Sequence, residues 1–409
     1  MNSVPAGAAP RAVLWFLVAS AFLGAMGIGL VVPVMPYLAG RFVSEHDLPL
    51  VVSLLSIAYS AAAFVAAPAL GALSDRFGRR PVLIISVLGS AVGYWMFGAA
   101  HAAWMLVAGR LIDGFTAGNF SAAFAALADS TQPADRGRNF GYMGASVGAG
   151  FIAGPAIGGL LAHFGVSAPL YFAAALCVAN ALFGLLFMPE TRPQDLPREP
   201  IVIARLNPFT QLRSLLELPA LRPLLWVGVL FAFPFAMMTT LLALLSKERL
   251  AWSVTQASTV FIAIGLCDVL VQAVLLGRIL ARFGERRAGL FGLILAMCGL
   301  LCMALIPFVP AGWLMFVSVV AFAVGEGIFT ACLSALLSIA AGPEAQGRVQ
   351  GGNQGLQSLT QIAGPLTGGA LYARVHSAAP FAFGALLLLC TAGLFAKVES
   401  RVPAREGAT

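Results

Sequence analysis

The chain has 409 residues, of which 60% are hydrophobic and 10% are charged, and its formal net charge at neutral pH is +7. Soluble domains carry about 25% charged residues, so a water-soluble fold could not bury this much apolar surface. The basic excess does not indicate a nucleic-acid partner, because the basic residues lie mainly between long apolar runs. The composition therefore predicts an all-α membrane protein.

The apolar residues fall into segments that each approach the roughly 20 residues needed to cross a bilayer as a helix. Twelve such segments are predicted: 12–38, 49–72, 82–99, 103–128, 140–162, 167–188, 221–245, 255–280, 288–307, 312–340, 349–373 and 378–396. Their runs are continuous rather than alternating with a period of two, which excludes the strands of a membrane barrel. No small-residue cleavage site follows the first segment, so we expect it to be retained.

The arginines and lysines predict the orientation of these segments. With the N-terminus in the cytoplasm, only Arg41, Lys247, Arg249 and Arg374 fall in outer loops, and Arg110 alone lies deep inside a segment. Basic residues accumulate in cytoplasmic loops of membrane proteins. We therefore expect a multi-pass protein of the inner membrane with both termini in the cytoplasm.

Two sequence patterns recur at nearly the same offset. GALSDRFGRRP at Gly71–Pro81 is echoed by GRILARFGERR at Gly277–Arg287, and GPAIGG at Gly154–Gly159 by GPLTGG at Gly364–Gly369. The offsets are 277 − 71 = 206 and 364 − 154 = 210, which predicts an internal duplication of the kind found in transporters. The expected domains are a six-helix half at 1–192, a cytoplasmic linker at 193–220 and a second six-helix half at 221–409.

The loop between the second and third segments carries a motif of small, acidic and basic residues: Gly71, Asp75, Arg76, Gly78, Arg79 and Arg80. It resembles the signature loop of the major facilitator superfamily. The resemblance implies that the acid, here Asp75, helps to latch the two halves together on the cytoplasmic side. The second copy has Ala281 at that position, so we expect an asymmetric latch.

The fifth segment carries a second motif, formed by Gly150, Gly154, Pro155, Gly158 and Gly159. Glycines at every fourth residue allow two helices to cross closely, and packing alone would explain them. The motif is also similar to the fifth-segment motif of antiporters in this superfamily.

The stretch AMGIGLVVPVMP at Ala25–Pro36 resembles the first span of the twelve-span tetracycline/proton exporters. Three membrane-embedded aspartates of those exporters do not carry over. Their first-, third- and ninth-span positions correspond here to Gly24, Gly93 and approximately Ala296. If this protein couples transport to protons, other acids must do so.

Three acids lie deep in apolar segments, and such residues are functional candidates by default. They are Asp113, Asp268 and Glu326. A carboxyl group held away from water retains its proton more readily than one in solution, which suits it to carrying protons. Arg110 and Asp113 are spaced to share a helix face, and their motif resembles that of proton-coupled members, although a purely structural ion pair would give the same spacing.

The neighbours of the other two acids suggest their surroundings. Gln272 is one turn from Asp268, so the two are expected to form a local polar pair. Glu326 lies between Gly325 and Gly327, small residues that would leave room for water or substrate. We expect Glu326 to be the principal proton site.

The eleventh segment is unusually polar, and its amides must face a partner helix or a wet cavity. Aromatic and amide side chains together suit a large, mostly apolar ligand. The residues expected to line a substrate cavity are Asn119, Phe231, Phe235, Gln272, Asn353, Gln354, Gln357 and Gln361.

These patterns predict a proton-coupled exporter of amphipathic or hydrophobic organic compounds, working by alternating access and functional as a monomer. The alternatives within transport are a metabolite symporter and a lipid translocase. We expect no cofactor and no metal, with the proton gradient as the energy source, because the sequence has no G-x-x-x-x-G-K-[ST] motif for ATP. An intramembrane enzyme is disfavoured, since no H-E-x-x-H motif, nucleophile elbow or histidine occurs in a segment.

Overall fold

Apolar segments of this length must satisfy their backbone hydrogen bonds internally in lipid, which makes them helices. The computed structural model describes residues 11–117, 120–132, 135–192, 207–209 and 221–398, with side chains for all but residues 11, 120–121, 136–137, 341–354 and 398. Within this part of the chain every regular element is helical, and ten helices are long and apolar enough to cross a membrane.

Contacts divide the chain into two compact units. Unit 1 comprises Met1–Pro208 and Trp252–Ile262, and unit 2 comprises Phe209–Ala251 and Ala263–Thr409. One boundary falls inside the predicted linker, most of which lies outside the described residues. The other two, on either side of Trp252–Ile262, fall inside the predicted second half.

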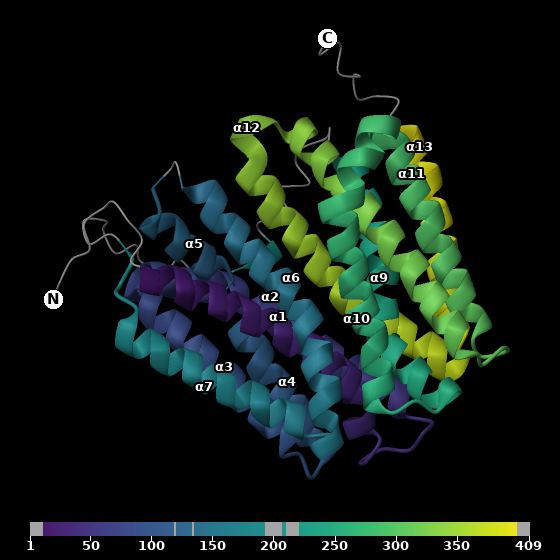
Figure 1. The fold of residues 1–409 in the computed structure, drawn as a ribbon, viewed down its shortest axis with the longest axis horizontal. Coiled ribbons are helices and arrows are strands. Elements are labelled where there is room, and N and C mark those ends of the chain that lie inside the picture. Colours follow the sequence, from purple (N-terminus) through teal and green to yellow (C-terminus); the bar gives the residue numbers. More distant parts are fainter. Residues whose placement is uncertain (1–10, 118–119, 133–134, 193–206, 210–220, 399–409) are drawn as a thin grey trace. The chain divides into compact units, whose positions relative to one another are not determined.

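Unit 1 contains the helices of the first six predicted segments (Figure 1). They are α1 (Arg11–Ala39), α2 (Leu48–Phe77), α3 (Arg79–Gly98), α4 (Ala103–Ala117), α5 (Phe120–Ser130), α6 (Arg136–Leu161), the 3₁₀ turn η1 (Ala162–Phe164) and α7 (Ala168–Phe187). Helix α1 packs along α6, while α3 packs on both α4 and α7. The predicted fourth segment corresponds to α4 and α5, which lie on either side of residues 118–119 and belong to one candidate membrane span, Ala103–Ser130.

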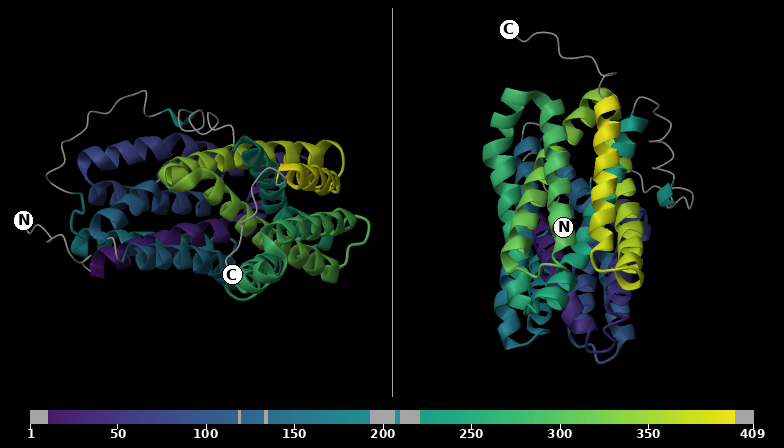
Figure 2. Two further views of the ribbon diagram at one scale, coloured as in Figure 1. Left: turned by 90° about the horizontal axis from the view of Figure 1, so that it is seen from above. Right: turned by 90° about the vertical axis from the view of Figure 1, so that its right-hand side faces the viewer.

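The helices of the second half follow α7 in the sequence (Figure 2). They are α9 (Arg222–Leu250), α10 (Val254–Leu270), the π-helical turn η3 (Val271–Leu275), α11 (Leu276–Leu305), α12 (Gly312–Arg374) and α13 (Ala379–Val398). Within unit 2, α12 packs on α11 and α9, and α13 packs on the same two helices.

Two predicted segment pairs run together as longer helical stretches. The helical stretch Val254–Leu305 covers the eighth and ninth predicted segments and is interrupted at Gly284, which has non-helical backbone angles. Helix α12 covers the tenth and eleventh and contains 63 residues. A straight helix of that length would measure about 95 Å, yet α12 reverses its direction near its middle (Figure 1), so it folds back rather than extending beyond a bilayer.

The backbone of the duplicated loop is also repeated. Gly78 and Gly284 both have positive φ, 108° and 68°, and they are separated by 284 − 78 = 206 residues. Such φ values strongly favour glycine, which explains the glycine in both copies. The guanidinium of Arg80 donates to the carbonyl of Leu185 in α7, and Arg286, again 206 residues later, donates to the carbonyl of Ala396 in α13.

A close helix crossing recurs with the same spacing. A side chain on Gly93 of α3 would lie 2.9 Å from the carbonyl oxygen of Gly109 and from the amide nitrogen of Asp113, both in α4. A side chain on Gly299 of α11 would lie 2.6 Å from the carbonyl oxygen of Ser318 and 2.7 Å from the amide nitrogen of Phe322, both in α12. The offsets are 206 for the glycines and 209 for both of their contacts, so the contact pattern matches Asp113 to Phe322.

Candidate functional site

The buried acid of unit 1 forms an ion pair on its own helix. Nη1 of Arg110 lies 2.9 Å from Oδ2 of Asp113, and both residues are at least 95% buried. The Arg110 guanidinium also lies 4.1 Å from the ring centroid of Tyr59 in α2, a cation–π contact. This confirms that Arg110 and Asp113 share a helix face, as their spacing predicts.

A glycine allows that contact between α4 and α2. A side chain on Gly114 would touch the carbonyl oxygen of Tyr59 and lie 3.0 Å from its Cα atom. Because Gly114 carries none, α4 closes onto α2 and brings the Tyr59 ring over Arg110. Tyr59 has no distinguishing sequence motif, so its role could not be predicted without the helix pairing.

Hydroxyl groups from α3 surround the carboxyl group of Asp113. Ser90 and Tyr94 direct their hydroxyls toward it, and Ser90 also shares a hydrogen bond of 3.1 Å with Thr116. A cavity of about 30 Å³ opens beside this group, with the following lining: Ser20, Leu23, Gly24, Tyr59, Val87, Ser90, Tyr94, Asp113, Ala117 and Cys177. The carboxyl group of Asp113 is therefore buried but not sealed in apolar side chains.

The two acids of unit 2 face each other. The carboxyl groups of Asp268 in α10 and Glu326 in α12 are close enough to interact directly. Oδ1 of Asp268 is buried and has no hydrogen-bond partner among the described residues. No salt bridge joins either carboxyl to a basic side chain in the described part of the chain, so this pair lacks the neutralising arginine that Asp113 has.

The glycines around Glu326 pack rather than leave space. A side chain on Gly325 would touch the carbonyl oxygen of Gly292 in α11 and lie 2.5 Å from the amide nitrogen of Ala296. A side chain on Gly327 would lie 3.2 Å from Val271 of η3. The expectation that these glycines leave room for water or substrate is wrong, because they bring α11 and η3 against α12 on either side of Glu326.

The expected pairing of Asp268 with Gln272 is also not observed. Gln272 lies in the π-helical turn η3 and is exposed, whereas Asp268 turns to Glu326. A π-helical turn alters the residue spacing that places positions four apart on one face. The one-turn spacing therefore did not predict a contact.

The fifth-segment motif, on α6, packs against α1. Side chains on Gly150 and Gly154 would touch the backbone of Phe22 and Met26, and Gly158 lies over Leu30. Pro155 lies close to Gly29, and Gly159 faces Ser258 within the same unit. The tight helix crossing predicted from the four-residue spacing is confirmed, and nothing in it requires a second role.

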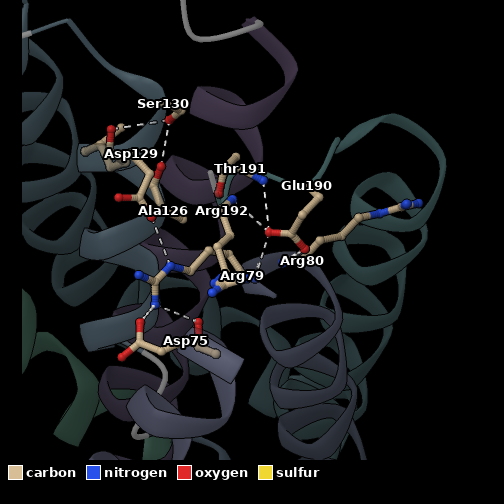
Figure 3. A network of polar contacts seen from close by, with 11 residues as sticks. Asp75, Arg79, Arg80, Ala126, Asp129, Ser130, Glu190, Thr191 and Arg192 are labelled. Carbon is tan, nitrogen blue, oxygen red and sulfur yellow. Dashed lines mark hydrogen bonds and ion pairs between the residues drawn. The ribbon is translucent and has the colours of Figure 1, made fainter. Parts of the chain in front are cut away.

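The signature loop carries a network of charges (Figure 3). Arg79, only 11% exposed, pairs with Asp75 and also lies 3.1 Å from Asp129 at the end of α5. Asp75 is 59% exposed, Arg76 stacks on the ring of Phe77, and Gly71 lies within α2. Asp129 is not among the residues predicted from the sequence, although its position just after the fourth predicted segment, on the same predicted side of the membrane as the basic loop, is a usable signal.

Glu190 binds the backbone at the start of α3. Its Oε1 accepts from the amide of Arg79 at 2.8 Å and its Oε2 from the amide of Arg80 at 3.2 Å (Figure 3). These amides are among the unpaired donors of a helix N-terminus, where negative charge is favourable. Glu190 thus fixes the end of α7 to the signature loop, a role that sequence reasoning did not assign.

The predicted substrate-cavity residues separate into different environments. Phe231 of α9 is 4% exposed and its ring lies 4.5 Å from that of Phe329, so it belongs to the core of unit 2 and not to a cavity wall. Phe235 is half-buried and pairs with Phe322. Gln357 and Gln361 are exposed.

Thr360, another polar residue of the eleventh segment, differs from those glutamines in its surroundings. Thr360 is buried and Gly364 packs against Phe233 and Ala236 of α9, so the described part of this segment is divided between a packed face and an exposed one. Asn119 lies outside the described residues, as do the side chains of Asn353 and Gln354.

Curated relatives share most of this chain. It is 36% identical over 351 residues to the class C tetracycline resistance protein of Escherichia coli, covering 86% of this chain and 87% of the relative. It is 37% identical over 363 residues to the class G tetracycline resistance protein of Vibrio anguillarum, with coverages of 87% and 89%. Multidrug resistance protein 2 of Bacillus subtilis (strain 168) is 25% identical over 397 residues, covering 94% of both chains.

Solved structures with low sequence identity have the same fold. The crystal structure of the human organic anion transporter MFSD10 gives a TM-score of 0.69 at 24% identity, covering 96% of this chain and 100% of the other. The crystal structure of the nucleoside transporter NupG gives a TM-score of 0.74 at 14% identity, covering 95% of this chain and 100% of the other. The family model described as Major Facilitator Superfamily matches residues 17–365 and 274–408. With this match and relatives above 30% identity along most of its length, the chain belongs to the Major Facilitator Superfamily.

Proposed function

We propose that this protein is a proton-coupled exporter of amphipathic or hydrophobic organic compounds, an antiporter that works by alternating access across the inner membrane. The relatives described above are named for tetracycline and multidrug resistance. The observation that carries the proton coupling is the Asp268–Glu326 pair, two facing carboxyl groups without a basic partner in the described part of the chain.

The proposed architecture has twelve spans in two repeated halves, with both termini in the cytoplasm. Three features recur at offsets of 206 to 211 residues and support the duplication: the positive-φ glycines, the hydrogen bonds from Arg80 and Arg286 to helix carbonyls, and the close helix crossings. The distribution of basic residues supports the orientation.

The proposed cycle uses the acids as proton carriers. A proton on Glu326 or Asp268 neutralises the pair and favours one orientation of the transporter, and release of that proton favours the other. Asp113, paired with Arg110, is a second carrier in unit 1. The energy comes from the proton gradient, which requires no cofactor, and the partners are protons, a small-molecule substrate and the lipid bilayer, with a monomer as the working unit.

The test is transport in proteoliposomes. The purified protein is reconstituted, the lumen is made acidic, and accumulation of tetracycline or the dye ethidium is measured with and without a protonophore. An antiporter accumulates at least one of these probes in the acidic lumen and loses the accumulation when the gradient collapses. Accumulation that is unchanged by the protonophore contradicts proton coupling.

A further inference from the structure

The cavity in unit 1 has the size and the lining of a water site. Its volume of about 30 Å³ exceeds the 10–15 Å³ that one water needs, and a buried water also needs two to four polar partners. Four of the lining residues carry polar groups: Ser20, Ser90 and Tyr94 have hydroxyls and Asp113 has a carboxyl group. An apolar cavity of this size would stay dry, whereas this one offers partners on several sides.

Separate contacts maintain the polar lining. A side chain on Gly27 of α1 would collide with the Tyr94 hydroxyl. Glycine at this position therefore leaves the space that the hydroxyl occupies. The amide of Asn180 in α7 donates to the hydroxyl of Ser20, which also lies on α1, at 2.8 Å. Helices α1, α3 and α7 thus hold polar groups around the space into which Asp113 projects from α4.

Arg110 has a second partner that does not depend on the charge of Asp113. Its guanidinium lies over the Tyr59 ring, and its Nε atom is buried without a hydrogen-bond partner among the described residues. The aromatic face attracts the cation whether or not the carboxylate is charged. Arg110 can therefore stay in place while Asp113 is neutral.

We propose that this cavity is a water site through which Asp113 exchanges its proton. In this step a hydronium ion in the cavity gives one proton to the carboxylate and becomes water, and the charge of the Arg110–Asp113 pair changes from zero to +1. The cation rests on the Tyr59 ring until the proton returns to water. This inference rests on the proposed proton coupling, and it adds the ligand of the cavity and a positioning role for Tyr59.

The titratable groups that face Asp113 come from four helices. They are Arg110 on α4, Tyr59 on α2, Tyr94 on α3 and Cys177 on α7, while α1 contributes only the uncharged Ser20, Leu23 and Gly24. Among these groups Asp113 carries the only carboxyl group, and Arg110 stays protonated.

Hydroxyl-radical footprinting of the full-length protein in proteoliposomes tests for the water. Radicals generated from a bound water oxidise neighbouring side chains even when these are buried, and mass spectrometry locates the oxidation. Tyr94 and Cys177 are expected to be oxidised well above Phe97, which is buried on the same helix as Tyr94 but is not part of the cavity lining. Oxidation of Tyr94 and Cys177 no greater than that of Phe97 would show a dry cavity and overturn the proposal.

A matched pair of variants tests what the water does. Val87→Leu adds a methylene group at the cavity wall, and Val82→Leu adds the same group at a buried position on α3 outside the lining. Displacing a water whose hydrogen bonds are not replaced is costly, so Val87→Leu is expected to lower both the oxidation of Tyr94 and the proton-driven accumulation of ethidium, the latter about tenfold. Val82→Leu is expected to change neither.

The outcomes separate this inference from the proposed function. Wild-type oxidation of Tyr94 without proton-driven transport would refute the proposed function and leave the water site standing. Lower oxidation in Val87→Leu with unchanged proton-driven transport would show that the water takes no part in coupling and overturn the exchange role. If Val87→Leu does not fold, the footprint of the wild-type protein still decides whether the cavity holds water.

Discussion

The buried acid of unit 1 and the buried acids of unit 2 have different electrostatic surroundings. Asp113 has an arginine at 2.9 Å, two hydroxyl groups and a polar cavity. Asp268 and Glu326 have each other, and helices packed closely on both sides of Glu326. A carboxylate beside an arginine is stable as an ion, whereas two facing carboxylates repel unless a proton is bound. The first site therefore has a counter-ion for the charged form of its acid, whereas the repulsion in the second site is relieved only when a proton is bound.

The proposed duplication allows the positions of the acids in the two units to be compared. The repeated helix crossing matches Asp113 to Phe322, and Glu326 lies four residues further along α12, which is about 6 Å of helix. Each half thus carries its acid at a different level of the corresponding helix. Under the proposed duplication, the charged position differs by about one turn between the two corresponding helices.

The largest expected effect is the loss of coupling in Glu326→Gln. The amide keeps the size of the side chain but cannot exchange a proton, so it imitates the protonated state at every pH. Proton-driven accumulation of ethidium in proteoliposomes should fall by about 100-fold, as expected when a positioned proton carrier is removed. Exchange of substrate for substrate should persist and should depend less on pH.

The control for this variant is Glu45→Gln, which removes an exposed acid outside the helices. It should transport as the wild type does. If Glu326→Gln accumulates ethidium against its gradient as well as the wild type does, Glu326 is not the coupling site, and the role passes to Asp268 or Asp113.

The next effect concerns stability and should differ between the two sites. Asp113→Asn leaves Arg110 buried without its counter-ion, and breaking a buried pair in this way costs about 3–5 kcal/mol. Asp268→Asn removes one of two facing acids and should change the free energy of unfolding by less than about 1 kcal/mol. Denaturant unfolding in detergent, followed by circular dichroism, measures both.

The double variant Arg110→Gln/Asp113→Asn provides the matched control, because it removes both charges of the pair. Most of the stability lost in Asp113→Asn should return. If the double variant is as unstable as the single one, the cost lies in side-chain shape and not in the unpaired charge.

Alanine substitutions of the glycines beside Glu326 should destabilise the protein more where the new methyl group meets rigid backbone than where it meets a side chain. Gly325→Ala meets backbone atoms of α11 and should destabilise the protein by about 1–3 kcal/mol, the usual cost of overpacking. Gly327→Ala meets the side chain of Val271 at 3.2 Å and should cost less. Gly148→Ala, where a side chain would meet nothing within 4 Å, should stabilise helix α6 by up to about 1 kcal/mol; unfolding midpoints of the three variants provide the ranking.

The smallest expected stability change is at the signature loop. Asp75 is 59% exposed, and exposed ion pairs contribute about 0–1 kcal/mol, so Asp75→Ala should unfold nearly as the wild type does. Its transport rate should nevertheless fall, because the acid is proposed to act in the conformational change. Equal transport by equal amounts of Asp75→Ala and wild-type protein in proteoliposomes would refute that role.

The sequence was sufficient to predict the helices and which residues share a face of one helix. It was not sufficient to predict which residues of different helices are in contact. Apolar length located the helices, and spacing alone paired Arg110 with Asp113 and placed Gly150, Gly154 and Gly158 on one face. The Asp268–Glu326 contact joins residues 58 positions apart in the sequence, and no local period encodes it. The same limit hid Tyr59 and Glu190, while Phe231 was misassigned because an aromatic residue suits a core and a ligand site equally.

The cap formed by Glu190 has a consequence for how this loop can diverge among related proteins. Both carboxylate oxygens bind main-chain amides, not the side chains of Arg79 and Arg80. This interaction is therefore indifferent to which residues, other than proline, occupy positions 79 and 80. Gly78 has no such freedom, since its φ is positive and any side chain there would collide with Glu190. Gly78 and Glu190 should therefore be inherited together, while the basic residues after Gly78 are free to interchange between lysine and arginine as far as the cap is concerned.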